Sequence, residues 1–400
     1  MSNTGKWALW ALMIGTAGLA TAAPRMALAV MLPEIREQLE LSLFQTGLIW
    51  GADVLTGVVS SVLGGTLSDR YGARTSLVVA CVCTGLFGMA RGLVPEFGWL
   101  LACSFLTGPF INLIPLNLHK AGAQIFPRRQ LSISNAGVSV GMASGFMLGA
   151  ITAATYLSPW LGSWRMVLAL FGSLGILCGC IWLFIPTRTG VNRVAEHAAG
   201  HNFTAGLQHV AKLRDIRLMT LANFGYGACV NSMLGYVPLF LRNVGWAGPR
   251  ADLAVSLFHV ASLLATLPFS VWSDRSSHRR YFMLAGSISL SLATFAIPLV
   301  ANQSVFAVMV LAGLMRDAFM SIMITRLMES EGVGPAYAGS AMGLSMVGMQ
   351  LGGAVAPAAG NALAALGPGR PFQFWSLLAL SAAALFWLVG DRHGPQDSAS

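Results

Sequence analysis

The chain has 400 residues, of which 55% are hydrophobic and only 10% are charged. Soluble proteins have about a quarter of their residues charged, so this composition excludes a soluble multidomain protein and requires that lipid cover most of the surface. The net charge of +9 could indicate a nucleic-acid partner. Such a partner needs a basic patch on one face of the protein, and the sequence contains no obvious patch of that kind.

Long apolar segments follow one another along the whole chain. A helix needs about 20 apolar residues to cross a bilayer core of about 30 Å, and these segments are apolar on all sides, unlike the alternating strands of a membrane barrel. The first is too long for a cleaved signal peptide. We therefore predict an all-α integral membrane protein with twelve transmembrane helices near 8–32, 43–65, 76–95, 97–118, 130–156, 164–186, 217–241, 251–271, 281–300, 303–325, 336–364 and 372–390.

The positions of the basic residues predict the orientation of these helices. Cytoplasmic loops of membrane proteins are enriched in Lys and Arg, and most of the 24 basic residues fall on one side if the N-terminus is cytoplasmic. We expect a multi-pass protein of the cell (inner) membrane with both termini in the cytoplasm. The basic excess is then a topology signal, and no nucleic-acid partner is expected.

A polar stretch at 187–216 divides the apolar segments into two sets of six. We predict an N-terminal six-helix bundle (1–186), a cytoplasmic central loop (187–216), a C-terminal six-helix bundle (217–390) and a cytoplasmic tail (391–400). An internal repeat supports this division, because an offset of 205 residues relates Pro33 to Pro238 and Gly108 to Gly313. Duplications of this kind produce two bundles related by an axis along the membrane normal.

The same offset relates residues 65–74, Gly-Thr-Leu-Ser-Asp-Arg-Tyr-Gly-Ala-Arg, to a weaker copy at 270–279. Residues 65–74 resemble the loop signature of the major facilitator superfamily, Gly-x-Leu-(Ala/Ser)-Asp-Arg-x-Gly-x-(Arg/Lys), and the twelve segments extend the resemblance to the whole chain. It implies a transporter whose loop latches the two halves, with Asp69 at the start of the eleventh helix and Asp274 at the start of the fifth. The gating residues would be Gly65, Asp69, Arg70, Gly72, Arg74, Asp274 and Arg275.

Ionisable side chains inside a membrane are costly unless they are paired or hydrated, so each marks a candidate functional site. In the superfamily, helices one, four, seven and ten line the central path. The resemblance therefore implies that the substrate contacts Arg25, Asn112, Asn231, Arg316 and Asp317. Neighbouring positions on a helix are turned by about 100°, so we expect one of Arg316 and Asp317 to face the cavity and the other to pair sideways, not with each other. A purely structural ion pair is the alternative.

Three residues are candidates for proton coupling: Asp53, Asp317 and His259. A desolvated carboxyl can hold a proton at neutral pH, and histidine titrates in the same range. Asp53 could instead be a structural partner of Arg25 or Arg91, and His259 a structural histidine. We expect Arg91, near the outer end of its helix, to extend its guanidinium to the membrane interface.

Residues 24–47 resemble the first-span pattern of the anion:cation symporters, in which an Asp precedes the Arg. Here Pro24 replaces that Asp, which removes the proton carrier that the resemblance would place in the first span. The drug/proton antiporters also have Asp at this position, so Pro24 argues against them as well.

Three interior arginines against two aspartates favour a small organic anion as the substrate. We predict proton-coupled uptake by alternating access in a monomeric protein that is not an enzyme and needs no cofactor or metal. Three alternatives remain open: an efflux antiporter for drugs or metabolites, a copper importer using methionines, and a non-transporting assembly or sensor protein. The substrate, the direction and the coupling ion are not determined by the sequence.

Overall fold

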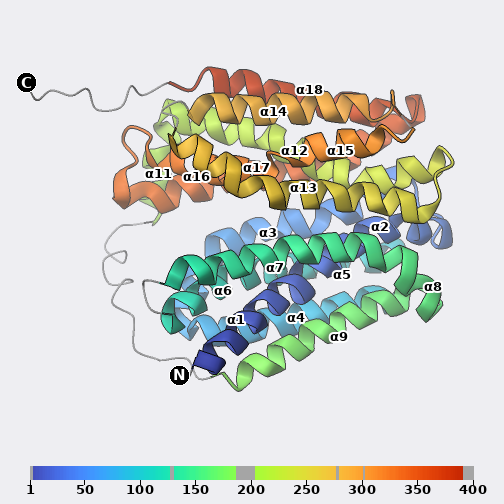
Figure 1. Ribbon diagram of the computed structural model, residues 1–400, viewed down its shortest axis with the longest axis horizontal. Helices are drawn as coiled ribbons and strands as arrows, with labels where there is room; N and C mark the ends of the chain where they lie inside the picture. Colours follow the sequence, from blue (N-terminus) through green and yellow to red (C-terminus); the bar gives the residue numbers. More distant parts are fainter. Residues whose placement is uncertain (1–2, 127–129, 186–202, 276–278, 301, 391–400) are drawn as a thin grey trace, which may run out of the picture.

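The computed structural model describes residues 3–126, 130–185, 203–275, 279–300 and 302–390. Within these ranges the chain is almost entirely helical and contains no strand. The helices run roughly along the long axis of the molecule (Figure 1). Nine of the described helical stretches are long and apolar enough to cross a membrane. The prediction of an all-α integral membrane fold is confirmed.

The described helices follow the predicted segments in order, and several segments are built from two helices joined by a local irregularity. In the first 183 residues these are α1 (Asn3–Ala17), a π-turn (Gly18–Ala22) and α2 (Ala23–Gln38); α3 (Leu43–Tyr71); α4 (Ala73–Leu93); α5 (Phe97–Ile111) and α6 (Leu113–Ile125); α7 (Leu131–Thr152), a π-turn (Ala153–Leu157) and α8 (Ser158–Leu161); and α9 (Trp164–Leu183).

After residue 202 the described elements are α11 (Phe203–Lys212), α12 (Arg214–Asn243), α13 (Gly248–Arg275), α14 (Arg279–Ala296), α15 (Val305–Gly313), α16 (Arg316–Met328), α17 (Gly334–Ala362) with a 3₁₀ turn (Leu363–Leu366), and α18 (Arg370–Trp387). In Figure 1 the blue-to-green helices α1–α9 and the yellow-to-red helices α11–α18 occupy two different sides of the molecule. We refer to them as the N-terminal and C-terminal sets.

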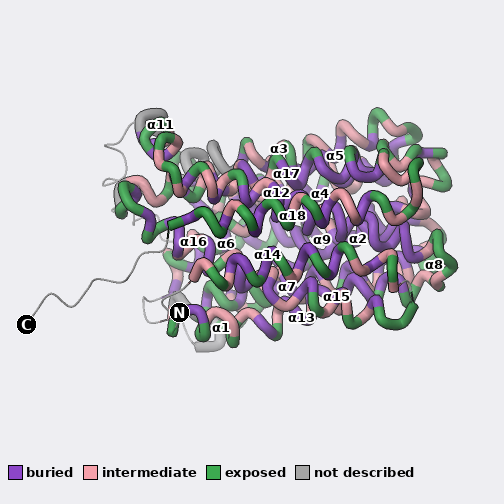
Figure 2. The backbone as a smooth tube through the Cα atoms, turned by 90° about the horizontal axis from the view of Figure 1, so that it is seen from above, coloured by how far each residue is buried: buried purple, intermediate pink, exposed green. Residues whose placement is uncertain are grey.

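The burial pattern follows from these two sets. Seen from above in Figure 2, buried stretches of chain alternate with exposed ones along the outer helices. α12 is the most enclosed of the apolar helices, with 89% of its most apolar window buried. It contacts α17, α18 and α2, which places it between its own set and the N-terminal set. A helix in this position can contribute side chains to a site between the sets.

The predicted central loop is partly helical. α11 lies within 187–216 and packs on α17, where the ring of His209 stacks on Tyr337 with centroids 4.4 Å apart. α12 begins at Arg214, so the C-terminal set starts earlier than predicted. Residues 187–202 and 391–400 lie outside the described ranges. The proposed division into two bundles, a loop and a tail stays a prediction.

The internal repeat is visible in the packing. Gly108 in α5 lies directly against the backbone carbonyl of Asp53 in α3, and Gly313 at the end of α15 lies against the backbone carbonyl of Phe258 in α13. Asp53 and Phe258 are themselves related by the offset that relates the two glycines. A backbone can approach this closely only where the facing residue has no side chain. The same close contact therefore occurs at equivalent places in both sets of helices.

Other glycines join helices within one set or across the two sets. Gly141 and Gly145 of α7 pack on the backbone of the first segment, whereas Gly348 of α17 packs on α12. The two sets meet where Gly47 and Gly51 of α3 contact the backbone of α17 at Ala358 and Ala354. Small residues thus allow α3 and α17 to pack closely between the sets.

The repeat predicts matched effects of two substitutions. Gly108→Ala and Gly313→Ala should each lower the free energy of unfolding by about 1–3 kcal/mol, because the added methyl group overlaps a backbone carbonyl. The control is Gly343→Ala in α17, where a methyl group meets open space. Thermal unfolding of the purified protein measures all three. Equal melting temperatures for the three variants would contradict the packing described here.

Candidate functional site

A cavity of about 240 Å³ lies between the two sets of helices. Its lining combines two arginines, amide side chains, aromatic rings and methionines. The polar lining residues are Arg25, Asn112, Asn231, His259, Arg316 and Gln350. Five of these six were predicted as site residues from the sequence. The structure thus brings most of the predicted residues together, while their part in binding stays a prediction.

Arg25 connects the two sets of helices. It follows the π-turn and Pro24, so it lies on the first turn of α2. Its Nε lies 3.5 Å from Oδ2 of Asp53, and its NH2 donates a hydrogen bond to Oδ1 of Asn231 in α12 at 3.2 Å. Its guanidinium lies 5.6 Å from the centroid of the Trp50 ring. Arg25 therefore contacts Asp53 in its own set of helices and Asn231 in the C-terminal set at the same time.

Asn231 is itself fixed in orientation. Its Nδ2 donates to the carbonyl of Gly353 at 2.7 Å, and its own backbone carbonyl accepts a hydrogen bond from Nε1 of Trp50 at 2.7 Å. The amide therefore presents its oxygen to Arg25. An amide with both ends engaged cannot rotate without losing these hydrogen bonds, each of which is worth about 0.5–1.5 kcal/mol.

Arg316 and Asp317 pair with each other, so our expectation that they could not do so is wrong. NH1 of Arg316 lies 2.5 Å from Oδ1 of Asp317. The two residues are the first two of α16, so they are turned by about 100° from each other as expected. The long, flexible side chain of the arginine nevertheless reaches the carboxylate of its neighbour.

The two members of this pair face different surroundings. Arg316 lines the cavity, and its guanidinium lies 5.6 Å from the centroid of Phe146. Oδ2 of Asp317 accepts a hydrogen bond from Ser262 of α13 at 2.7 Å. Asp317 is not among the cavity-lining residues in the described part of the chain. The arginine therefore faces the cavity and the aspartate is turned toward α13.

The two other proton-coupling candidates are both deeply buried. Asp53 is 3% exposed, and its Oδ1 has no hydrogen-bond partner among the described residues. His259 lines the cavity and stacks on Phe146 with ring centroids 4.9 Å apart, and its Nε2 has no partner in the same ranges. Each therefore keeps a polar atom that could receive or donate a proton.

Arg91 does not extend to the membrane interface, so that expectation is wrong. It is 3% exposed and lines a small internal cavity of about 20 Å³ together with Pro24 and Thr107. The last turn of α4 is covered by α9, since Gly92 lies against the backbone carbonyl of Arg165. The guanidinium is thus enclosed within the N-terminal set.

The predicted gating motif lies at the end of α3, which is followed by Gly72 with a φ of 83°. Arg74 donates from Nε to the carbonyl of Trp182 at 3.1 Å and also contacts the carbonyl of Leu183. It therefore caps the C-terminus of α9. Arg70 and Arg275 are exposed. The side chains of Gly65, Asp69 and Asp274 lie outside the described part of the structure, so the latch stays a prediction.

One end of the cavity is closed by contacts between the two sets of helices. Thr155 donates a hydrogen bond to Oδ2 of Asp252 in α13 at 2.8 Å, and Asp252 is held by NH2 of Arg242 at 2.9 and 3.1 Å. Nδ2 of Asn361 donates to the carbonyl of Leu43 at 3.0 Å. Asp252 and Arg242 were not identified from the sequence, because charges at the ends of apolar segments look like ordinary loop residues.

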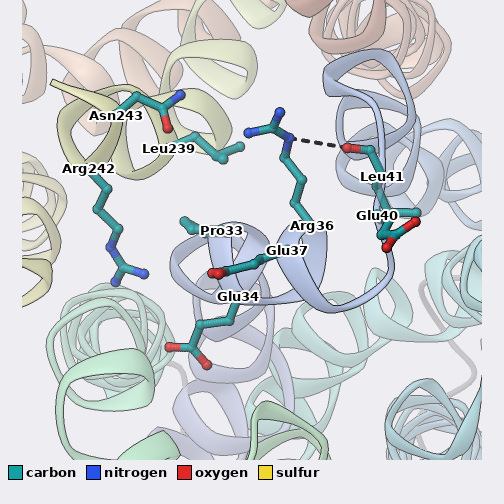
Figure 3. A pocket seen from close by; sticks show the side chains of 9 residues that line it. All are labelled: Pro33, Glu34, Arg36, Glu37, Glu40, Leu41, Leu239, Arg242 and Asn243. Atoms are coloured by element: carbon teal, nitrogen blue, oxygen red, sulfur yellow. Dashed lines mark hydrogen bonds between the residues drawn. The ribbon is translucent and has the colours of Figure 1, made fainter.

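A wider pocket of about 590 Å³ lies at this closed end, between α2 and α12. Figure 3 shows its acidic side chains Glu34, Glu37 and Glu40 on or just after α2, and Arg36 with its hydrogen bond to the carbonyl of Leu41 at 3.2 Å. Carboxylates and guanidinium groups are mixed on its walls, and several are exposed. Among the described residues the central cavity has arginines as its charged lining groups and no carboxylate, so it is the stronger candidate for substrate binding.

Apolar helices around a central cavity that is lined by two arginines and several amides indicate a multi-pass membrane protein of the transporter type. The family model of the Major Facilitator Superfamily matches residues 14–250 and 240–400. The chain therefore belongs to the major facilitator superfamily, which consists of transporters and not of enzymes. This confirms the family resemblance seen in the loop signature.

Similar proteins include transporters of organic anions. The chain is 31% identical to a hexuronate transporter of Bacillus subtilis (strain 168) over 240 residues, which are 58% of this chain and 55% of that protein. It is 25% identical over 283 residues to the 4-hydroxybenzoate transporter PcaK of Pseudomonas aeruginosa, covering 59% and 63%. The chain thus spans little more than half the length of these two relatives.

Another relative is the multidrug resistance protein MdtH of Shigella dysenteriae, 22% identical over 356 residues, with 82% and 80% of the two chains covered. Among solved structures, a bacterial homologue of the human lysosomal transporter Spinster in an inward-facing and occupied conformation has a TM-score of 0.78 at 15% identity, with 99% and 100% coverage. A mutant of the nucleoside transporter NupG has a TM-score of 0.76 at 14% identity, with 95% and 98% coverage. At these identities the two structures establish the fold alone.

The contacts at the closed end generate a prediction. Thr155→Val removes the hydroxyl that joins the two sets and leaves the Arg242–Asp252 pair intact. One such hydrogen bond is worth about 0.5–1.5 kcal/mol, so the ratio of open to closed molecules at this end should rise about two- to tenfold. Spin labels at Trp160 and Arg250, which are exposed, can measure this change. The fraction of molecules with a longer distance between the two labels should rise.

The matched control is Thr152→Val, since Oγ1 of Thr152 bonds only to the carbonyl of Leu148 in its own helix among the interactions described. It should leave the distance distribution as in the parent protein. Identical distributions for Thr155→Val and Thr152→Val would mean that the Thr155–Asp252 contact does not hold this end closed.

Proposed function

We propose that this protein is a secondary active transporter of the cell (inner) membrane that takes up a small organic anion together with protons by alternating access. One observation carries the proposal. Both charged side chains on the cavity wall in the described residues are arginines, one from each set of helices, whereas their aspartate partners are not among the lining residues. An anion in the cavity would therefore meet the guanidinium groups first.

The walls of the cavity suit a carboxylate on a small polar or aromatic body. Guanidinium groups bind carboxylates through paired, charge-assisted hydrogen bonds. Trp50 and Phe146 flank the two arginines, and the amides of Asn112 and Gln350 provide further polar groups. The volume of about 240 Å³ is below the range of about 300–1,000 Å³ typical of sites for drug-sized ligands. This supports a small solute.

Arg25 offers a physical basis for movement. It belongs to the N-terminal set but bonds to Asn231 of the C-terminal set, so a substrate that takes over its NH2 competes with a contact between the sets. A ligand can shift a conformational equilibrium only if it interacts differently with the two conformations, and competition for Arg25 provides such a difference. In the predicted orientation the closed end of the cavity faces outward, and the structure is then a state closed to the outside.

Asp53 and His259 are the groups that we assign to proton coupling. A substrate carboxylate bound to Arg25 brings a second negative charge close to Asp53. Uptake of a proton by Asp53 relieves the repulsion between the two carboxylates. His259 lies at the cavity wall beside Phe146 and has an unpaired Nε2 among the described contacts. It could exchange protons with the cavity. Asp317 is assigned as the counterion that orients Arg316 and as a further proton acceptor.

Efflux of amphiphilic compounds is a second candidate function. Met26, Met320, Met346 and Met349 line the cavity, and flexible thioether side chains adapt to varied ligands. The similarity to MdtH covers most of this chain. A resistance assay in an efflux-deficient strain separates this function from anion uptake.

Uptake of radiolabelled 4-hydroxybenzoate and glucuronate into proteoliposomes tests the proposed function. Arg25→Gln and Arg316→Gln should each lower the initial rate at low substrate concentration about tenfold or more, because each removes a charge-assisted hydrogen bond to the carboxylate. Arg250→Gln, which removes an exposed charge remote from the cavity lining, is the control and should transport like the parent protein.

The same vesicles test the coupling ion. With an inward proton gradient the labelled acid should accumulate above equilibrium, and a protonophore should abolish the accumulation. If wild-type rates persist in both cavity variants for an acid that the protein demonstrably transports, the assignment of an anionic substrate is wrong.

A further inference from the structure

Arg91 is a buried charge that the proposed cavity does not use. It is 3% exposed, and its Nε and NH2 have no hydrogen-bond partner among the described residues. An arginine cannot lose its proton in a protein, so it must be compensated by another charge or by water. The small cavity beside it has a volume of about 20 Å³, which is enough for about one water molecule.

Asp53 lies close to this cavity and can supply the compensating charge. Its backbone carbonyl contacts Gly108, the neighbour of the cavity-lining Thr107, and its carboxylate pairs with Arg25, the neighbour of the cavity-lining Pro24. Oδ2 of Asp53 faces Arg25, while Oδ1 is buried and has no hydrogen-bond partner within the described ranges. Two orphaned polar groups of opposite charge are thus enclosed in the same set of helices. One aspartate is shared electrostatically by two arginines.

The charges of this group do not cancel. Arg25 and Arg91 contribute two positive charges and Asp53 one negative charge, which leaves one positive charge on the N-terminal side of the cavity. On the C-terminal side, Arg316 is matched by Asp317 at 2.5 Å. Arg242 near the closed end is matched by Asp252. The surplus is therefore located at Arg25, the one member of the group of three that lines the cavity.

We propose that Arg91 is a positioning residue that draws Asp53 away from Arg25, so that the cavity binds an anion with a single carboxylate. Without Arg91, Asp53 would neutralise Arg25, and the substrate would have to displace a complete ion pair. With Arg91, the carboxylate of the substrate completes the charge balance. A second carboxylate would find no further uncompensated positive charge, because Asp317 already balances Arg316. This inference rests on the proposed anion-binding function and names its substrate class.

A double-mutant cycle on purified full-length protein tests the inference, with 4-hydroxybenzoate binding measured by calorimetry. Arg91→Gln should weaken binding about tenfold, because Asp53 then pairs with Arg25 alone. In a protein with Asp53→Asn there is no carboxylate for Arg91 to attract, so Arg91 should no longer affect binding at Arg25. Asp53→Asn and the double variant Arg91→Gln/Asp53→Asn should therefore bind equally, and both more tightly than Arg91→Gln.

Three further measurements sharpen the test. Arg91→Lys keeps the charge and should bind within about threefold of the parent protein, and Arg250→Gln removes an exposed charge and should bind as the parent does. Benzene-1,4-dicarboxylate should bind at least about tenfold more weakly than the monocarboxylate, because its second charge has no uncompensated partner. If Arg91→Gln alone does not fold, weaker binding by Arg91→Gln/Asp53→Asn than by Asp53→Asn still contradicts the inference, because the inference predicts equal binding.

The outcomes separate the two proposals. Failure of the wild-type protein to bind any small carboxylate contradicts the proposed function, and the role of Arg91 in recognition with it. Wild-type binding that Arg91→Gln leaves unchanged overturns the role of Arg91 alone. So does a loss of affinity in Arg91→Gln/Asp53→Asn relative to Asp53→Asn, which would indicate a purely structural arginine.

Discussion

The free-energy cost of placing charge in a membrane interior constrains how the described helices of this protein pack. An ionised side chain away from water costs several kcal/mol unless it is paired or hydrated, and 10% charged residues leave few to be placed. Most charges in the interior of the described helices are paired: Arg242 with Asp252, Arg316 with Asp317, Arg326 with Asp215, and Arg25 with Asp53, while Arg91 is enclosed in the same set of helices as Asp53. The helices are packed so that these groups can meet.

Pairing also connects the charges to the movement that a transporter requires. Buried ion pairs add little net stability compared with well-packed apolar residues, yet removing one partner is costly. In this protein the ion pairs hold in position the side chains that connect the two sets of helices. Asp252 accepts a hydrogen bond across the two sets of helices from Thr155, and Arg25 donates one across them to Asn231. Any rotation of one set against the other must exchange these contacts for others, and in the function that we propose a substrate carboxylate would replace the contact at Arg25.

Close backbone contact is the second requirement. Glycines bring helix backbones together around the buried groups, at Gly108 beside Asp53 and at Gly51 beside Ala354. The repeat places the corresponding contact of Gly313 beside Phe258, next to His259. The duplicated backbone therefore presents a titratable residue at similar places in the two sets, although the residues themselves have diverged.

Much of this could be predicted from the sequence, and the exceptions have physical causes. Apolar segments and the loop signature were enough to predict the fold and the family, because lipid imposes helices whatever the substrate. The pairing of Arg316 with Asp317 could not be predicted, since helical spacing fixes where the two side chains start on α16 but not how far a long arginine side chain reaches. The burial of Arg91 depends on α9 covering the end of α4. Trp50 and Phe146 are ordinary residues in apolar sequence, and only the packing shows that they flank the arginines.

The central claim is that one uncompensated positive charge in the cavity selects an anionic solute. Calorimetric comparison of 4-hydroxybenzoate with 4-hydroxybenzamide on the wild-type protein tests it most directly, because the two compounds differ little in shape and differ by one charge. The account predicts that the amide binds at least about tenfold more weakly than the acid. Equal affinities would contradict it, because shape and hydrogen bonding would then account for recognition without the charge.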